Sequence, residues 1–231
     1  MAASASKRRD ELVEFYKELS DCQKCPLAET RTTVVFGTGN ADADLMFVGE
    51  APGFHEDRQG VPFVGQAGKL LSTLLEEIGL SREAVYIANV LKCRPPGNRD
   101  PRPEEIEACE GYLFTQVAKI RPRVICTLGN FATKLLSGRP EGITRVHGRP
   151  RPHRIGDVEV NLYPIYHPAA ALYTPRMLDT LREDFSRLPE LLRDGPAPPP
   201  RQPAPAIPVA PPPIKVAVAV GEPEPAQLGL F

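Results

Sequence analysis

Four short apolar runs separated by helical patterns constrain the fold of this chain more than any other feature. The runs lie at residues 45–48, 85–90, 124–128 and 162–166, and each has the character of a buried strand. Strands that alternate with helices are joined by right-handed crossovers, which produce a parallel sheet with helices on both faces. The helices are expected at residues 6–19, 70–78, 104–119, 130–136 and 175–193.

The chain divides into a folded body and a tail. Its 231 residues suffice for one domain with a real core. Residues 196–231 contain 12 prolines and no aromatic side chain except Phe231, so they bury too little apolar surface to offset their ordering entropy. We expect a domain at residues 5–194, a disordered proline-rich linker at 195–226 and a separate peptide at 227–231.

Charge does not mark the whole chain as a nucleic-acid binder, because the formal net charge is −1. Residues 139–154 are the exception, since they carry five arginines and two histidines against Glu141 alone. Glycine and prolines interleave with these charges and predict a stiff basic loop. A charge run is usually a solvated face, but this one also suits contact with phosphate groups. No apolar stretch resembles a signal peptide or a membrane span, so we expect a cytoplasmic protein.

Four of the five cysteines form a candidate metal site. Cys22 and Cys25 make a C-x-x-C pair, and Cys93 and Cys109 complete a set of four thiols. Such a set suits either tetrahedral zinc or an iron–sulfur cluster, and spacing alone does not choose between them. The alternative is a redox pair with unrelated core cysteines. Cys126 lies inside an apolar run and is predicted to be a packing residue.

Three polar residues from distant parts of the chain follow predicted strands. Glu50 comes two residues after the first run, Asn89 lies near the end of the second, and His167 follows the fourth. In open parallel sheets, ligands bind beyond the carboxyl ends of the strands. We therefore expect these three side chains to converge on one site.

Several motifs together resemble the family 4 uracil-DNA glycosylases, the iron–sulfur type. The resemblance spans about residues 10–190, and its motifs occur in the expected order. They are Cys25-Pro26-Leu27, Gly49-Glu50-Ala51-Pro52-Gly53, Pro62-Phe63-Val64-Gly65, Asn89, Lys92-Cys93-Arg94-Pro95-Pro96, Asn98-Arg99 and His167-Pro168-Ala169-Ala170. The resemblance implies a three-layer α/β/α domain with a four-stranded parallel sheet. It also implies a 4Fe-4S cluster held by the four cysteines, and monofunctional excision of uracil from single- or double-stranded DNA.

The resemblance assigns the candidate residues to the base and to its release. An enzyme that acts on a base in DNA must take it out of the stack, and Phe63 would supply a ring for it to stack on. Asn89 carries a donor and an acceptor, which match uracil and mismatch cytosine. His167 would donate a hydrogen bond to the uracil O2 as negative charge grows there.

The remaining assignments concern the sugar, the water and the edge of the base. Glu50 would stabilise the cationic sugar or position the attacking water, with Asn98 as the residue that orients it. The backbone of Ala51 would line the base site, and Glu56 would lie near C5 and exclude the thymine methyl. The best-known uracil glycosylases carry an aspartate where Ala51 stands, so the sequence lacks an obvious general base.

Two further segments bear on how DNA is handled. A related branch crosslinks to DNA through a histidine in an inserted basic loop, and residues 95–109 contain neither the insertion nor a histidine. We therefore expect turnover. Leu172 and Tyr173, shortly after His167, are interpreted either as a wedge that enters the groove or as an ordinary connecting loop.

The last five residues, Gln227 to Phe231, resemble the peptide by which bacterial repair and replication proteins dock on the sliding clamp. A flexible tether would give this anchor its reach. We expect a monomer that associates with the nucleoid when it acts. Two alternatives stay open: a non-catalytic module that binds DNA or a replication partner, and a zinc-bound nucleotide hydrolase, which the absence of a phosphate-binding glycine loop disfavours.

Overall fold

A computed structural model describes residues 5–194 of the chain. One six-stranded sheet lies at its centre, with the strand order β1-β3-β2-β4-β6-β5. The four inner strands run parallel, and the two outer strands pair antiparallel to their neighbours. The strands are β1 (Thr38–Gly39), β2 (Leu45–Gly49), β3 (Tyr86–Asn89), β4 (Val124–Leu128), β5 (Arg151–Ile155) and β6 (Val158–Ile165).

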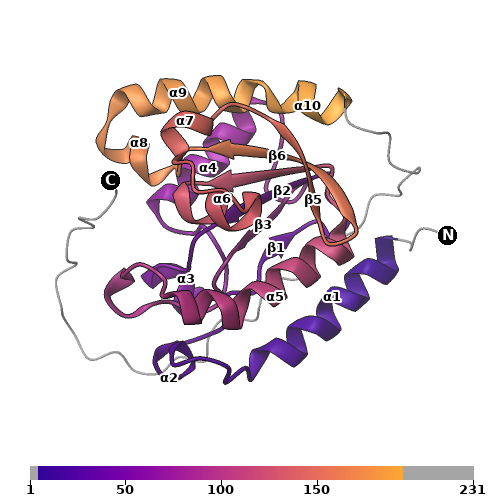
Figure 1. The fold of residues 1–231 in the computed structure, drawn as a ribbon, viewed down its shortest axis with the longest axis vertical. Helices are drawn as coiled ribbons and strands as arrows, with labels where there is room; N and C mark the ends of the chain where they lie inside the picture. The colour runs from indigo at the N-terminus through magenta and orange to yellow at the C-terminus, as the bar shows by residue number, and fades with distance from the viewer. Residues whose placement is uncertain (1–4, 195–231) are drawn as a thin grey trace.

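Helices cover both faces of this sheet (Figure 1). One layer contains α1 and α5, and the other contains α4, α9 and α10. The longer helices are α1 (Ala5–Ser20), α4 (Gln66–Glu77), α5 (Pro103–Ile120), α6 (Asn130–Ser137) and α9 (Pro175–Ser186). The shorter ones are α2 (Leu27–Thr30), α3 (Phe54–Gln59), the 3₁₀ turn η1 (Pro96–Asn98), α7 (Ile143–Val146), α8 (Ala169–Tyr173) and α10 (Leu188–Asp194).

The two hydrophobic layers follow the alternation of side chains along each buried strand. In β2, Met46 and Val48 belong to the layer with α1 and α5, whereas Leu45 and Phe47 belong to the layer with α4 and α9. All five residues of β2 are buried, as expected of a central parallel strand. The predicted three-layer α/β/α architecture is confirmed.

The sheet is wider than the four parallel strands that were predicted. Those four strands are present, with β4 at the predicted residues, and β1 and β5 extend the sheet on either side. The segment 139–154 is not wholly a loop, because it contains α7 and the first four residues of β5. The predicted helix at 175–193 is divided into α9 and α10. The predicted tail and its terminal peptide lie outside the described residues.

The four parallel strands end at one edge of the sheet, at Gly49, Asn89, Leu128 and Ile165. Asn89 is itself one of these strand ends, and the other predicted base-site residues lie on segments that follow them. No helix within residues 5–194 is long and apolar enough to cross a membrane.

Candidate active site and cysteine cavity

Asn89 lies at the carboxyl end of β3, directly beside Gly49 at the end of β2. Its side chain is buried, and its Oδ1 has no hydrogen-bond partner among the described residues. A Cβ atom added to Gly49 would lie 2.4 Å from that oxygen and 2.7 Å from Cζ of Phe63. Glycine is therefore required at position 49 to let the amide and the ring approach the same point.

Phe63 is held in a backbone conformation that non-glycine residues rarely adopt, with a φ of 55°. Its loop is fixed from two sides. The Oε1 atom of Glu56 accepts hydrogen bonds from the backbone N–H groups of Val64 (2.9 Å) and Gly65 (3.0 Å). The guanidinium of Arg82 donates to the backbone carbonyls of Phe63 (3.0 Å) and Pro62 (2.8 Å). These contacts compensate for the strain and fix the ring.

His167 follows β6, and its ring lies 5.5 Å from the ring of Phe63. The backbone N–H of Ala169 donates to Nδ1 at 3.1 Å, so the ring proton of the neutral imidazole is on Nε2. Burial lowers the pKa of His167 to about 4, against a smaller opposing effect of Glu56. The imidazole is therefore neutral at physiological pH and presents one N–H donor.

Glu50 follows Gly49 on the loop after β2. Burial, and then the negative charge of Asp100, raise the pKa of Glu50 to about 7. Ala51 is half-buried and packs against the core beside α5. The strand ends thus place a carboxylate that titrates near neutral pH next to the residues that hold Asn89 and Phe63.

Two predicted residues have side-chain partners that the sequence did not indicate. Asn98 is exposed in η1, and its Oδ1 accepts a hydrogen bond from Nε of Arg94 at 2.6 Å. Asp100, two residues later, is the residue whose charge acts on Glu50. Glu56 holds the Phe63 loop through the two bonds described above. Its predicted role in excluding the thymine methyl stays a prediction.

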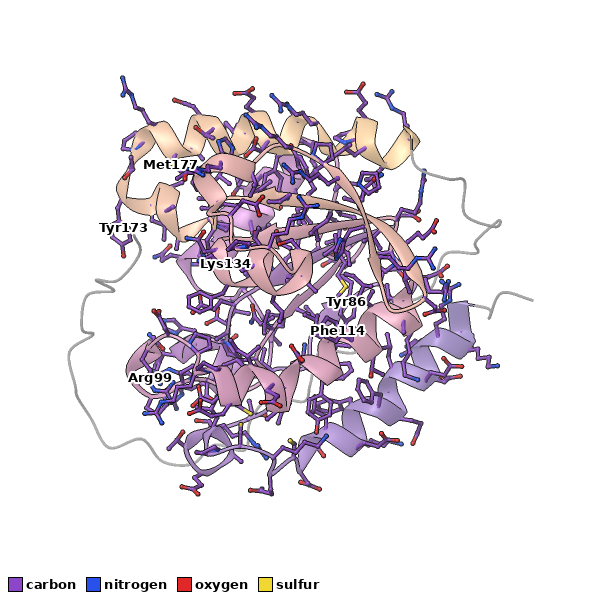
Figure 2. The ribbon with its side chains drawn as sticks, viewed as in Figure 1. Tyr86, Arg99, Phe114, Lys134, Tyr173 and Met177 are labelled. Atoms are coloured by element: carbon purple, nitrogen blue, oxygen red, sulfur yellow. The ribbon has the colours of Figure 1, made fainter. Side chains whose placement is uncertain are left out.

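Leu172 and Tyr173 lie on α8, a short helix and not a connecting loop. They are 42% and 71% exposed, which is unusual for large apolar side chains. Figure 2 shows Tyr173 at the upper left of the molecule and Arg99 at the lower left. Both residues belong to segments that follow strand ends, so an exposed apolar side chain and a half-buried arginine, which is paired with Glu105, flank the candidate site.

The four predicted ligands Cys22, Cys25, Cys93 and Cys109 line one cavity between α1, α2 and α5. Each of three sulfurs also has a polar neighbour. The hydroxyl of Tyr112 lies 3.2 Å from the sulfur of Cys22, the Lys92 N–H lies 3.3 Å from that of Cys109, and the Arg31 guanidinium lies 3.6 Å from that of Cys93. Donors directed at sulfur stabilise thiolates.

Four thiols, and no histidine or carboxylate of the described residues, line the cysteine cavity. Within residues 5–194, no three His, Cys, Asp or Glu side chains are grouped to hold a single metal ion. In a multi-iron cluster each thiolate binds a different iron, so the sulfurs must stand further apart than around zinc. This donor set and the cavity fit an iron–sulfur cluster, which Cys22, Cys25, Cys93 and Cys109 would hold. Cys126 is fully buried in the opposite layer, as predicted for a packing residue.

Comparison with known proteins places these features in a family. Residues 36–191 match the model of the uracil DNA glycosylase superfamily. The chain is 47% identical over 186 residues to a type-4 uracil-DNA glycosylase of Archaeoglobus fulgidus, covering 79% of this chain and 94% of the relative. It is also 47% identical over 166 residues to the type-4 enzyme of Thermotoga maritima, covering 71% and 85%. The chain is a type-4 member of the uracil-DNA glycosylase superfamily.

A type-5 uracil-DNA glycosylase of Pyrobaculum aerophilum is more distant, at 30% identity over 215 residues, which are 78% of this chain and 90% of the relative. The predicted family 4 membership is therefore confirmed.

Sequence reasoning also missed Lys92, which positions the site of this glycosylase. Lys92 is fully buried, and its Nζ donates to the backbone carbonyl of Asn89 at 2.8 Å and to Oε1 of Gln116 at 2.6 Å. Burial lowers its pKa to about 8. Its backbone N–H is the group directed at Cys109, so one residue contacts both Asn89 and a cysteine of the cavity. The sequence held one signal for this role. A charged residue, Lys92, stands between Leu91 and Cys93 shortly after a buried strand.

Proposed function

We propose that this glycosylase takes uracil out of DNA into the site at Gly49 and hydrolyses its N-glycosidic bond, leaving an abasic site. One observation carries the proposal. A buried amide with an unpaired oxygen, a fixed aromatic ring and a neutral N–H donor come together at the carboxyl edge of the sheet. A flipped base offers a π-face and a hydrogen-bonding edge, which this set complements.

Asn89 gives the site its preference for uracil. Its amide can donate to O4 and accept from N3–H, whereas cytosine offers the reversed pattern at those positions. A buried amide left without a partner is costly, so cytosine would be rejected and not merely bound less well. Phe63 supplies the stacking face, and the Ala51 backbone lines the site. Glu56 anchors the Phe63 loop and would lie toward the C5 side of the base.

Bond cleavage moves an electron pair from the C1′–N1 bond onto the base and leaves positive charge on the sugar. His167 donates its Nε2–H to O2 and stabilises the developing anion without giving up its proton. Glu50, as a carboxylate, stabilises the sugar cation and orients the water whose oxygen bonds to C1′, and the proton that this water loses neutralises the released uracil anion. Asn98 is proposed as a further group that orients this water.

A 4Fe-4S cluster would be held by Cys22, Cys25, Cys93 and Cys109. When bound, such a cluster supplies structural crosslinks between the segments that carry its ligands. Cys93 lies between Lys92 and Arg94. The Lys92 ammonium donates a hydrogen bond to the backbone carbonyl of Asn89, and the Arg94 guanidinium donates one to the side chain of Asn98. A bound cluster would therefore also hold the segment that carries Lys92 and Arg94.

The partner implied by this function is DNA, and a monomer associated with the nucleoid is proposed. Residues 227–231 are proposed to bind the sliding clamp. Deleting these five residues should abolish association with the clamp in a pull-down and leave excision from short duplexes unchanged. Loss of excision in the truncated protein would contradict an independent role for the tail.

The proposed function is tested with a labelled duplex that carries one uracil. Incubation followed by alkali should cut the strand only at uracil, with a thymine duplex as the control. Asn89→Ala and His167→Ala should each reduce cleavage sharply while retaining the wild-type melting temperature. An iron-loaded preparation that leaves the uracil duplex uncut would favour a non-catalytic DNA-binding module.

A further inference from the structure

Phe54 is an exposed aromatic residue with two arginines close to its ring. It begins α3, and 47% of its surface is exposed. The guanidinium carbon of Arg94 lies 5.2 Å from the centre of its ring, and that of Arg58 lies 5.7 Å away. The ring of His55 meets it edge-on at 5.4 Å. Phe54 belongs to neither hydrophobic cluster of the described residues, and its ring contacts these cationic and imidazole groups.

The carboxylates next to this cluster are engaged elsewhere. Glu56 accepts the N–H groups of Val64 and Gly65, and the buried Asp57 accepts the backbone N–H of Thr32 at 2.9 Å. Arg58 is exposed, and Arg94 donates to the neutral amide of Asn98. The surface around Phe54 therefore combines an aromatic face with cationic groups, which complements a polyanion that carries flat bases.

The cluster lies at the same edge of the sheet as the base site. Phe54 follows Glu50 by four residues, and the helix it begins carries Glu56, which anchors the Phe63 loop. Arg94 bonds to Asn98, two residues before Asp100, whose charge acts on Glu50. A DNA strand with one nucleotide at Asn89 and Phe63 would thus pass close to Phe54.

We propose that Phe54, Arg58 and Arg94 form a stacking platform for an unpaired base of the substrate strand beside the flipped uracil. The ring stacks on the base, and the guanidinium groups bind the adjoining phosphates. The identity of this strand rests on the proposed function. A paired base has both faces covered by its neighbours, so the platform engages single-stranded DNA more strongly than a duplex.

The test uses the full-length protein and single-stranded oligonucleotides with 2′-fluoro-deoxyuridine, whose fluorine slows cleavage of the glycosidic bond. The fluorescent base 2-aminopurine stands on the 5′ side of the uridine in one oligonucleotide and on the 3′ side in another, because stacking quenches it. Phe54→Ala should weaken binding about 5- to 100-fold, as expected for one base–aromatic stack. The same variant should abolish the quenching on one side, and Phe54→Trp should restore it.

Arginine variants separate the phosphate contacts from the stacking. Arg58→Ala should reduce the slope of log affinity against log salt by about 0.7, as expected for one contact to single-stranded DNA. Arg121→Ala is the matched control, because Arg121 is an exposed arginine near the opposite edge of the sheet. It should leave the slope unchanged.

The outcomes distinguish the platform from the proposed function. Quenching that is equal in wild-type protein and Phe54→Ala, with both folded by melting temperature, would overturn the platform even if uracil is excised. If quenching is lost in Phe54→Ala but the wild-type protein leaves natural uracil DNA uncut, the platform is retained and the proposed function is overturned.

Discussion

The base site and the cysteine cavity lie near each other but are built on different principles. The base site is positioned by groups that the chain itself supplies, such as the N–H of Ala169 on the His167 ring and the Lys92 ammonium on the backbone carbonyl of Asn89. In the cysteine cavity, burial raises the pKa of Cys93 and raises that of Cys109 to about 11. Burial thus favours neutral thiols there, while a cluster requires thiolates.

This difference separates a preorganised site from a site that a ligand completes. The base site keeps its free polar groups directed at a substrate, so its variants should affect catalysis more than folding. The cysteine cavity should behave in the opposite way, because a bound cluster would crosslink the segment between α1 and α2, the segment after β3, and α5. Lys92 contacts both regions and limits how independent they are.

The sharpest test of a preorganised base site is His167→Ala. Removing a donor to a developing oxyanion lowers kcat by about 100- to 1000-fold. Single-turnover excision kinetics would measure this loss, and thermal unfolding should show no comparable change in Tm. Because the pKa of His167 is about 4, titration of this residue should cause no change in the wild-type rate of excision above pH 5. A large drop in Tm would mean that His167 mainly supports the fold.

The cysteine cavity can be tested with two chemically identical changes. Cys109→Ala should lose iron and lower Tm by about 10 °C, because metal binding contributes directly to folding. Cys126→Ala removes an equally buried thiol from the opposite layer and should cost only about 1 kcal/mol through the space it leaves. Iron content and Tm are the measurements. If Cys109→Ala and Cys126→Ala changed iron content and Tm equally, the assignment of the cavity as a cluster site would be contradicted.

Glu50→Gln should separate activity from stability. The carboxylate is the active form, so wild-type kcat/KM should fall about tenfold for each pH unit below about 7, and the variant should lack that dependence. Folding raises the pKa of Glu50, so its favourable contribution to stability is complete below pH 4.5 and is lost as pH rises through 7. The glutamine variant should therefore be more stable at pH 8, by on the order of 1–2 kcal/mol and with a correspondingly higher Tm, and it should have the wild-type Tm at pH 4. A higher wild-type Tm at pH 8 would contradict this account.

The smallest expected effect tests the link between the two regions. Lys92→Met should lower kcat/KM about tenfold, because the Asn89 carbonyl loses its buried donor. Iron content should stay at the wild-type level, since the backbone N–H directed at Cys109 is retained. Uracil discrimination against cytosine should fall in the same measurements. A variant with wild-type discrimination would show that Asn89 is held without the lysine.

The sequence predicted the inner strands well and the outer strands not at all. A parallel strand buried on both faces, such as β4, is a continuous apolar run and is visible without structural data. β1 has two residues, and β5 reads Arg-Pro-His-Arg-Ile with four of its five side chains outside the core. Edge strands of this kind carry no burial signal, so the basic character of residues 151–154 suggested a loop.

The same contrast applies to the candidate site. Residues of a distinctive type at strand ends, such as Asn89 and His167, could be predicted because topology alone brings them together. Lys92, the anchoring role of Glu56 and the influence of Asp100 could not, because their partners are backbone groups or charges that only the folded chain brings near. The cluster around Phe54 was missed for the same reason, since Arg94 lies 40 residues along the chain.

The composition of β5 also bears on self-association. It is the outermost strand on its side of the sheet, and a free strand edge offers unpaired backbone groups to any chain of similar shape. Pro152 has no N–H to offer, and Arg151 and Arg154 are exposed, the latter paired with Glu159 on β6. A second copy approaching this edge would meet like charge and an incomplete set of donors. The edge therefore resists aggregation between molecules crowded along the same DNA.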